Sequence, residues 1–154
     1  MICTGNICRS PIAEVVVRHL VQADPSLDGQ VEVTSAGTAN WHVGKPMDDR
    51  ARRALDRAGF TGAGTLGQFA SGDYLDQQDI VVVMTREHLV DVKKRLSNPG
   101  TDIILLRNLL EPGLNLDVHD PYYDGDEAFD ECLALVTQAA QLLTSEFRQR
   151  LDVA

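Results

Sequence analysis

A thiol and a guanidinium lie close together near the start of the chain, in a spacing that suits chemistry on a phosphate ester. Cys3 and Arg9 flank five residues, most of them small or turn-forming: Thr4, Gly5, Asn6, Ile7 and Cys8. Arginine offers a planar fork that contacts two phosphoryl oxygens at once, and a cysteine thiolate is a strong nucleophile. The pattern therefore predicts attack of sulfur on phosphorus.

A helix is expected directly after this loop. Ser10 is a good N-cap residue, Pro11 suits the first helical position, and residues 12–23 have helical character. A loop that closes on a helix N-terminus presents several backbone N–H groups to one point, and the helix dipole adds positive potential there. We therefore expect the loop to bind a tetrahedral anion and to stabilise the Cys3 thiolate.

The segment CTGNICRSP resembles the phosphate-binding loop of the low-molecular-weight protein tyrosine phosphatases. The resemblance is specific because the spacing of Cys3 and Arg9 is accompanied by further residues of the family pattern, namely Gly5, Asn6, Cys8, Ser10 and Pro11. It implies an enzyme that needs neither metal nor cofactor, in which Cys3 is the nucleophile and Arg9 binds the phosphate. The remaining loop residues would surround the anion.

The resemblance also implies a set of supporting side chains. Asn6, Ser10 and Ser35 match family positions whose side chains hold the loop in its anion-binding conformation. Asparagine suits this task because it tolerates a left-handed backbone and both donates and accepts hydrogen bonds. Relatives usually add a histidine at the place where our alignment puts Gly64, so the supporting network is expected to be thinner here.

A cysteine phosphatase also needs a general acid for the leaving oxygen and then a base for the attacking water, and one carboxyl group can do both. The segment that begins at Asp120 and Pro121 resembles the acid loop of the family, so we assign this role to Asp120. An aspartate before a proline is usually only a turn former. The assignment therefore depends on the presence of the Cys3–Arg9 loop.

Three aromatic residues are expected to form a slot for a flat aryl phosphate, namely Trp41, Tyr122 and Tyr123. An isolated tryptophan is more often part of a core, but the neighbours of Trp41 are polar or small, which favours a pocket wall. The two tyrosines match positions that are phosphorylated in some relatives. Whether they are phosphorylated in this chain is left open by the sequence.

Two further cysteines, Cys8 and Cys132, are not assigned to the catalytic step. Cys8 is either a resolving thiol that forms a reversible disulfide with Cys3 or a small packed residue, and both interpretations stay open. Cys132 lies on the apolar stripe of the last helix and is expected to be core. No histidine or acidic cluster has the spacing of metal ligands, so no metal site is predicted.

Strands and helices are expected to alternate, with strands at residues 31–37, 79–84 and 102–106 and helices at 48–58, 85–96 and from 126 onward. This order indicates an α/β fold. The family resemblance sharpens it to one three-layer α/β/α domain, residues 1–154, with a central four-stranded parallel sheet. Only two residues precede Cys3, so the first strand is expected to be truncated and the native chain to begin upstream of Met1.

The composition limits the partners. Fourteen Lys and Arg against 23 Asp and Glu give a net charge of −9, which argues against nucleic acid or an anionic membrane. The chain has neither an apolar run of membrane length nor a segment like a signal peptide. We therefore expect a cytoplasmic protein, with a monomer favoured.

The function favoured by these residues is hydrolysis of phosphotyrosine in protein substrates. A protein arginine phosphatase shares the fold and loop, but those enzymes typically carry threonine where this chain has Ile7. An arsenate reductase would need further cysteines near a mobile segment, which Cys132 alone does not provide. A non-catalytic phosphate or redox sensor would have no use for Asp120.

Overall fold

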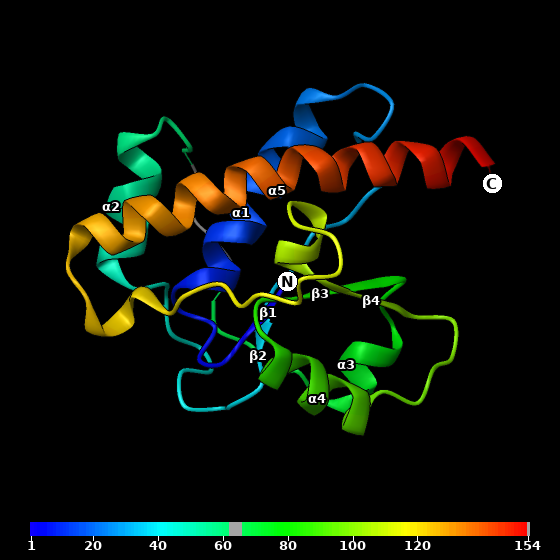
Figure 1. Cartoon of the computed structure of the whole chain (residues 1–154), viewed down its shortest axis with the longest axis horizontal. Helices are drawn as coiled ribbons and strands as arrows, with labels where there is room; N and C mark the ends of the chain where they lie inside the picture. The colour runs from blue at the N-terminus through cyan, green and yellow to red at the C-terminus, as the bar shows by residue number, and fades with distance from the viewer. Residues whose placement is uncertain (62–65, 154) are drawn as a thin grey trace.

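The computed structural model describes residues 1–61 and 66–153, which form a parallel sheet between two layers of helices (Figure 1). The sheet has four strands in the order β2-β1-β3-β4, and every neighbouring pair is parallel. The strands are β1 (Ile2–Cys3), β2 (Ala36–Gly37), β3 (Ile80–Val83) and β4 (Asp102–Leu105). The three-layer α/β/α architecture predicted from the sequence is confirmed.

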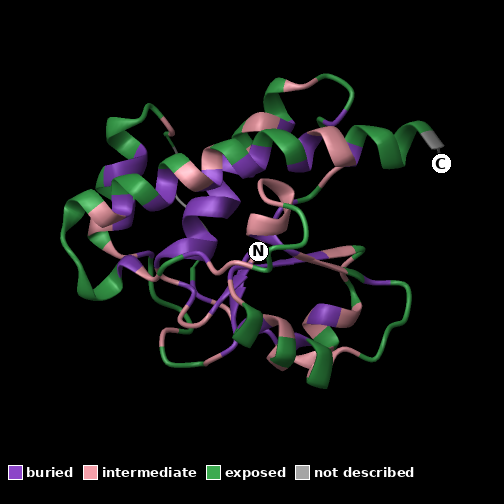
Figure 2. Cartoon of the chain, in the orientation of Figure 1, coloured by how far each residue is buried: buried purple, intermediate pink, exposed green. Residues whose placement is uncertain are grey.

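The helices cover the two faces of the sheet unequally (Figure 1). One face is covered by α1 (Arg9–Ala23), α2 (Asp49–Arg57) and α5 (Asp126–Val153), and the other by α3 (Gly72–Asp76) and α4 (Arg86–Arg95). Two 3-10 turns, η1 (Leu106–Leu109) and η2 (Pro121–Tyr123), precede α5. The larger apolar core lies under α1 and α5, where Figure 2 shows the buried residues of α1 together.

The apolar patterns of β3 and α5 explain these layers. Along β3 the side chains alternate between the cores, with Val82 in the larger one and Val81 and Val83 in the smaller. The predicted stripe of α5 is buried from Phe129 onward, but Leu151 is 39% exposed. The apolar stripe is therefore not buried as far as Leu151, because the last turns of α5 project beyond the sheet (Figure 1).

The strand β1 is as short as expected, yet it lies in the middle of the sheet. Ile2 pairs with Ala36 on one side and with Val83 on the other, while Cys3 pairs with Gly37. The strand predicted at residues 31–37 is therefore wrong in length, since a ladder requires a neighbouring strand and β1 pairs only with its last two residues. β3 and β4 agree with the predicted strands within two residues.

The predicted helix starts were right where the cap is purely local. The Asp48 carboxylate accepts a hydrogen bond from the Arg50 N–H at the start of α2, and the Thr85 hydroxyl accepts one from the His88 N–H at the start of α4. Gly59, which follows α2, has φ +83° as expected for a C-terminal glycine. The short helix α3 was not predicted.

The start of α1 differs from its prediction. The helix begins at Arg9, its cap residue is Cys8, and no side chain in the described part of the sequence caps it. The Ser10 side chain is turned inward to Cys3 and Asn6 instead, so the N-cap role assigned to it was wrong. None of the helices in the described ranges is long and apolar enough to cross a membrane.

Candidate active site

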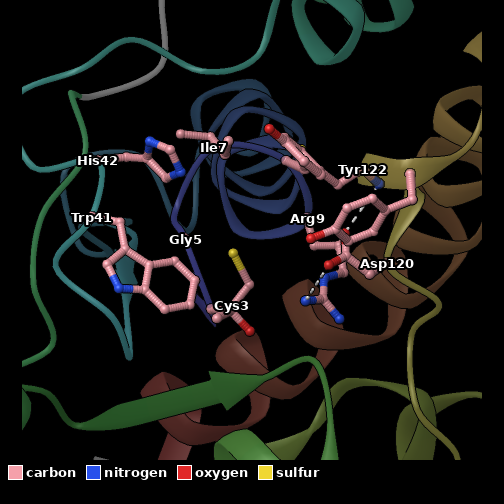
Figure 3. A pocket seen from close by; sticks show the side chains of 11 residues that line it. Cys3, Gly5, Ile7, Arg9, Trp41, His42, Asp120 and Tyr122 are labelled. Carbon is pink, nitrogen blue, oxygen red and sulfur yellow. Dashed lines mark hydrogen bonds and ion pairs between the residues drawn. The ribbon is translucent and has the colours of Figure 1, made fainter.

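An open pocket of about 220 Å³ lies at the carboxyl end of β1, which ends at Cys3 (Figure 3). The carboxyl edge of a parallel sheet is the usual place for a ligand in an α/β fold. The structure brings all the predicted catalytic and wall residues to this pocket, which is lined by Cys3, Arg9, Asp120, Trp41, Tyr122 and Tyr123. The loop residues Thr4, Gly5, Ile7 and Cys8 line it as well.

The sulfur of Cys3 points toward the middle of the pocket (Figure 3). Cys3 is the last residue of β1 and is only 3% exposed. Ser10 Oγ lies 2.9 Å from Cys3 Sγ, so the serine hydroxyl can donate to the sulfur when it is a thiolate. The N-terminus of α1 lies at the other end of the loop and favours a negative charge there.

The three supporting residues meet behind the loop. Asn6 has φ 56°, in the left-handed region, and its Nδ2 donates to Ser10 Oγ at 2.8 Å and to Ser35 Oγ at 2.9 Å. Asn6 Oδ1 accepts from the Gln68 N–H at 2.9 Å. The Ser35 hydroxyl in turn donates to the fully buried carboxylate of Glu14, which the sequence did not single out. Gly64 lies outside the described residues.

Arg9 is a buried cation, although it ends a loop that faces the pocket. It is 5% exposed, and its Nη1 donates to the Val118 carbonyl at 3.1 Å. Nη2 lies 3.4 Å from Asp120 Oδ2, but Nε has no hydrogen-bond partner among the residues that the structure describes. A buried N–H without an acceptor is costly, so this donor suits an anion in the pocket.

The acid loop is fixed to the sheet just before Asp120. The Val118 N–H donates to the Met84 carbonyl at 2.8 Å, which ties this segment to the end of β3. Asp120 Oδ1 accepts from the Tyr122 N–H at 3.2 Å, and Pro121 begins the turn η2. The Asp120 carboxylate is 42% exposed, so water can reach it.

The aromatic residues form walls and not core. Trp41 is 68% exposed, which contradicts the core alternative, and Tyr122 and Tyr123 are exposed too. The two tyrosine rings meet edge to face at 5.0 Å. The Arg50 guanidinium lies 5.4 Å from the centroid of the Tyr122 ring and donates to the Asp124 carbonyl. These two contacts stabilise the position of Tyr122. The sequence offered no signal for them.

Two further residues contact the loop and were missed. A Cβ added at Gly37 would lie 2.5 Å from the Thr4 carbonyl oxygen, so only glycine lets β2 approach the loop so closely. The buried imidazole of His88 on α4 is hydrogen-bonded through Nε2 to Thr4 Oγ1 at 2.8 Å. Burial, with the positive charge of Arg9, lowers the pKa of His88 to about 4. Both contacts join segments far apart in sequence.

The cysteines other than Cys3 are poorly suited to redox chemistry. Cys8 is 4% exposed, and burial together with the charge of Asp48 raises the pKa of its thiol well above the ordinary range. This favours the packed interpretation of Cys8. Cys132 is buried in the core as predicted, and burial raises its pKa to about 12. Across residues 1–61 and 66–153, no group of three or more His, Cys, Asp or Glu is placed to hold a metal.

Comparison with known proteins gives the site a context. The family model described as low molecular weight phosphotyrosine protein phosphatase matches residues 1–152. A low molecular weight protein-tyrosine-phosphatase of Streptomyces coelicolor is 38% identical over 156 residues, which cover 98% of this chain and 93% of the relative.

Solved structures of phosphatases have the same fold as this chain. The crystal structure of YfkJ from Bacillus subtilis superposes with a TM-score of 0.83 at 30% identity and covers 97% of this chain and 92% of its own. The tyrosine phosphatase Wzb from Escherichia coli K30, in complex with sulphate, has a TM-score of 0.81 at 30% identity and covers 95% of each chain. This chain therefore belongs to the low molecular weight phosphotyrosine protein phosphatase family, and it is a phosphatase.

Proposed function

We propose that this phosphatase hydrolyses phosphotyrosine in proteins through a phosphocysteine intermediate. Cys3 is the nucleophile, Arg9 binds the phosphoryl group, and Asp120 is the general acid and then the base. The observation that carries this proposal is the unpartnered Nε of the buried Arg9 guanidinium, which lines the same pocket as the Cys3 sulfur. A buried cation with a free donor is an incomplete arrangement that an oxyanion completes.

In the first step the Cys3 thiolate attacks phosphorus, the S–P bond forms and the P–O bond to tyrosine breaks. Asp120 gives its proton to the departing phenol oxygen, so tyrosine leaves as a neutral hydroxyl. Arg9 and the loop N–H groups stabilise the charge on the three remaining oxygens. The Ser10 hydroxyl, 2.9 Å from Sγ, stabilises the thiolate before attack.

In the second step the Asp120 carboxylate takes a proton from water, and the water oxygen attacks the thiophosphate. The P–O bond forms, the S–P bond breaks, and inorganic phosphate leaves with the thiolate restored. The partial exposure of Asp120 gives water access to this carboxylate. Neither step requires a metal ion.

The walls support an aryl substrate. Trp41 and Tyr122 stand on opposite sides of the Cys3 sulfur, and Ile7 closes a third side (Figure 3). A flat ring is favoured between aromatic and aliphatic side chains, whereas the charged guanidinium of phosphoarginine would find no polar partner at Ile7. The sulphate complex of the Escherichia coli relative is consistent with a tetrahedral anion at this site.

The experiment compares wild type with Cys3→Ser on para-nitrophenyl phosphate and on matched phosphotyrosine and phosphoarginine peptides. We expect Cys3→Ser to lose turnover by about a thousandfold or more while it still binds inorganic phosphate, because the loop and Arg9 are intact. Turnover that survives in Cys3→Ser would refute the nucleophile. A preference of wild type for phosphoarginine would refute the substrate class.

A further inference from the structure

His88 is a buried histidine that touches the phosphate loop from the opposite layer of the fold. It lies in the first turn of α4 and is 2% exposed. Its Nε2 is 2.8 Å from the hydroxyl of Thr4, the residue that follows the nucleophile in the chain and lines the pocket. This hydrogen bond ties the beginning of the loop to α4.

The surroundings of His88 keep it neutral. Its Nδ1 is buried and has no hydrogen-bond partner in the described ranges, so a proton there would lack an acceptor. Burial and the positive charge of Arg9 favour the neutral ring, and the carboxylates of Asp91, Asp117 and Asp120 oppose them only in part. The neutral imidazole can donate to Thr4 Oγ1 or accept from it, depending on the tautomer.

The same turn of α4 also holds the acid loop. The Arg86 N–H donates to Asp117 Oδ1 at 2.9 Å, and the Arg86 guanidinium pairs with the same carboxylate. Val118, next in the chain, accepts from Arg9 and leads to Asp120. The first turn of α4 is therefore joined to the acid loop through Arg86 and to the phosphate loop through His88.

We propose that His88 is a positioning residue of the phosphate loop, which acts through the Thr4 hydroxyl and does so in its neutral form. By holding Thr4 against α4, His88 keeps the Cys3 end of the phosphate loop at a fixed distance from the acid loop. A bound phosphoryl group needs both loops at that distance. The proposal rests on the function proposed above and extends it to a residue outside the loop.

The experiment uses the full chain and three substitutions that differ in where they place a polar atom. The amide of His88→Gln reaches the position of Nε2, that of His88→Asn reaches only the position of Nδ1, and His88→Leu has none. Thr4→Val removes the other partner, and the exposed His19 on α1 provides a matched control, His19→Gln. Readouts are kcat and KM for para-nitrophenyl phosphate, the calorimetric Kd for inorganic phosphate, and the unfolding temperature.

We expect His88→Leu and His88→Asn to raise the Kd for phosphate by about three- to tenfold, the loss of one hydrogen bond, and to lower kcat/KM similarly. His88→Gln should stay within about twofold of wild type, and His19→Gln should be unchanged. The double variant Thr4→Val/His88→Leu should bind phosphate no more weakly than the single variant that has the larger loss of affinity, because both substitutions remove the same hydrogen bond. The kcat/KM ratio of wild type to His88→Gln should fall as pH approaches 4, because only wild type becomes charged there.

Equal phosphate affinity in His88→Leu and wild type, or additive effects of the two substitutions, would overturn the proposal. If His88→Leu fails to fold, the comparison of His88→Gln with His88→Asn decides, and equal values for the two also overturn it. The phosphate Kd separates the two proposals. A wild type without turnover on phosphotyrosine refutes the proposed function, while the effect of His88 on phosphate binding is still measured.

Discussion

The Arg9 guanidinium lies 3.4 Å from the Asp120 carboxylate, although the arginine is buried and the aspartate is partly exposed. The anion-binding group and the proposed proton donor are thus paired across the pocket. A phosphate dianion that binds Arg9 competes with Asp120 for the same positive charge. The pair therefore places the proposed proton donor directly beside the group that would bind the phosphoryl oxygens.

Replacement of Asp120 by Asn should remove proton transfer while it leaves the shape of the loop in place. We expect kcat on a phosphotyrosine peptide to fall by about 10²- to 10³-fold. The loss should be smaller on aryl phosphates with more acidic phenols, since such leaving groups need less protonation. A series of substituted phenyl phosphates measures this dependence, and an equal loss on all of them would argue against a general acid.

His119→Asn is the matched control for that series. His119 precedes Asp120 in the chain, is largely exposed, and pairs with Asp124 at 2.5 Å and not with the pocket residues. We expect kcat and its leaving-group dependence to remain near wild type. A loss comparable to that of Asp120→Asn would move the proton donor to the histidine.

Arg9→Lys keeps the positive charge but loses the planar fork. The three N–H groups of a lysine ammonium share one nitrogen, so they cannot occupy the separate positions of Arg9 Nη1, which donates to the Val118 carbonyl, and Nε, which is free for phosphate. We expect kcat/KM to fall by about a thousandfold, or roughly 4 kcal/mol of transition-state stabilisation. Steady-state kinetics measure it, with the exposed Arg52→Lys on α2 as a control. A loss below tenfold would mean that charge alone suffices.

Gly37→Ala should disturb the phosphate loop from β2. The new methyl group would lie 2.5 Å from the Thr4 carbonyl and 3.0 Å from that of Ala39, both backbone atoms that cannot rotate away. We expect the free energy of unfolding to fall by about 1–3 kcal/mol and phosphate binding to weaken. Gly125→Ala, where a Cβ has no neighbour within 4 Å, should not change stability comparably in urea titrations. Equal effects at the two glycines would contradict the close approach.

The stability of the protein should depend on pH through His88. Its folded pKa of about 4 is below the ordinary 6.5, so the unfolded chain binds more protons between these values. The contribution of His88 to the free energy of unfolding is complete above pH 6.5. It is lost as the pH falls from 6.5 to about 4, and the total loss is about 3 kcal/mol. Urea unfolding of wild type and His88→Gln at pH 7, 6 and 5 isolates this term, because other groups titrate in both. Parallel curves would show that His88 is not buried as a neutral ring.

Much of the site was predictable because its chemistry is concentrated in short segments. Cys3 and Arg9 share one loop, and the Asp120 segment shares one turn with its tyrosines, so residue type and spacing were enough to propose them. The caps of Asp48 and Thr85 were predictable for the same reason, since each bonds an N–H two or three residues away.

The remainder depends on tertiary contacts that no local pattern contains. Serine is a common N-cap residue, but the Ser10 hydroxyl is hydrogen-bonded to Asn6 and Cys3 and does not cap the helix. His88 and Glu14 reach the loop network from other helices, and their burial shows only in the folded chain. The length of β2 is set by how far β1 extends beside it. The alternation of side-chain types along residues 31–37 carries no information about the length of that neighbouring strand.

The start of α1 links the proposed phosphate site to the stability of the fold. No acidic residue lies in the first turn, and within the described residues no side chain caps the helix, so the oxyanion is the acceptor that this helix end lacks. Binding is then linked to folding: phosphate at one hundred times its Kd adds about 2.7 kcal/mol to the free energy of unfolding. Product release removes that acceptor in every turnover, and the protein is at its least stable when the pocket is empty.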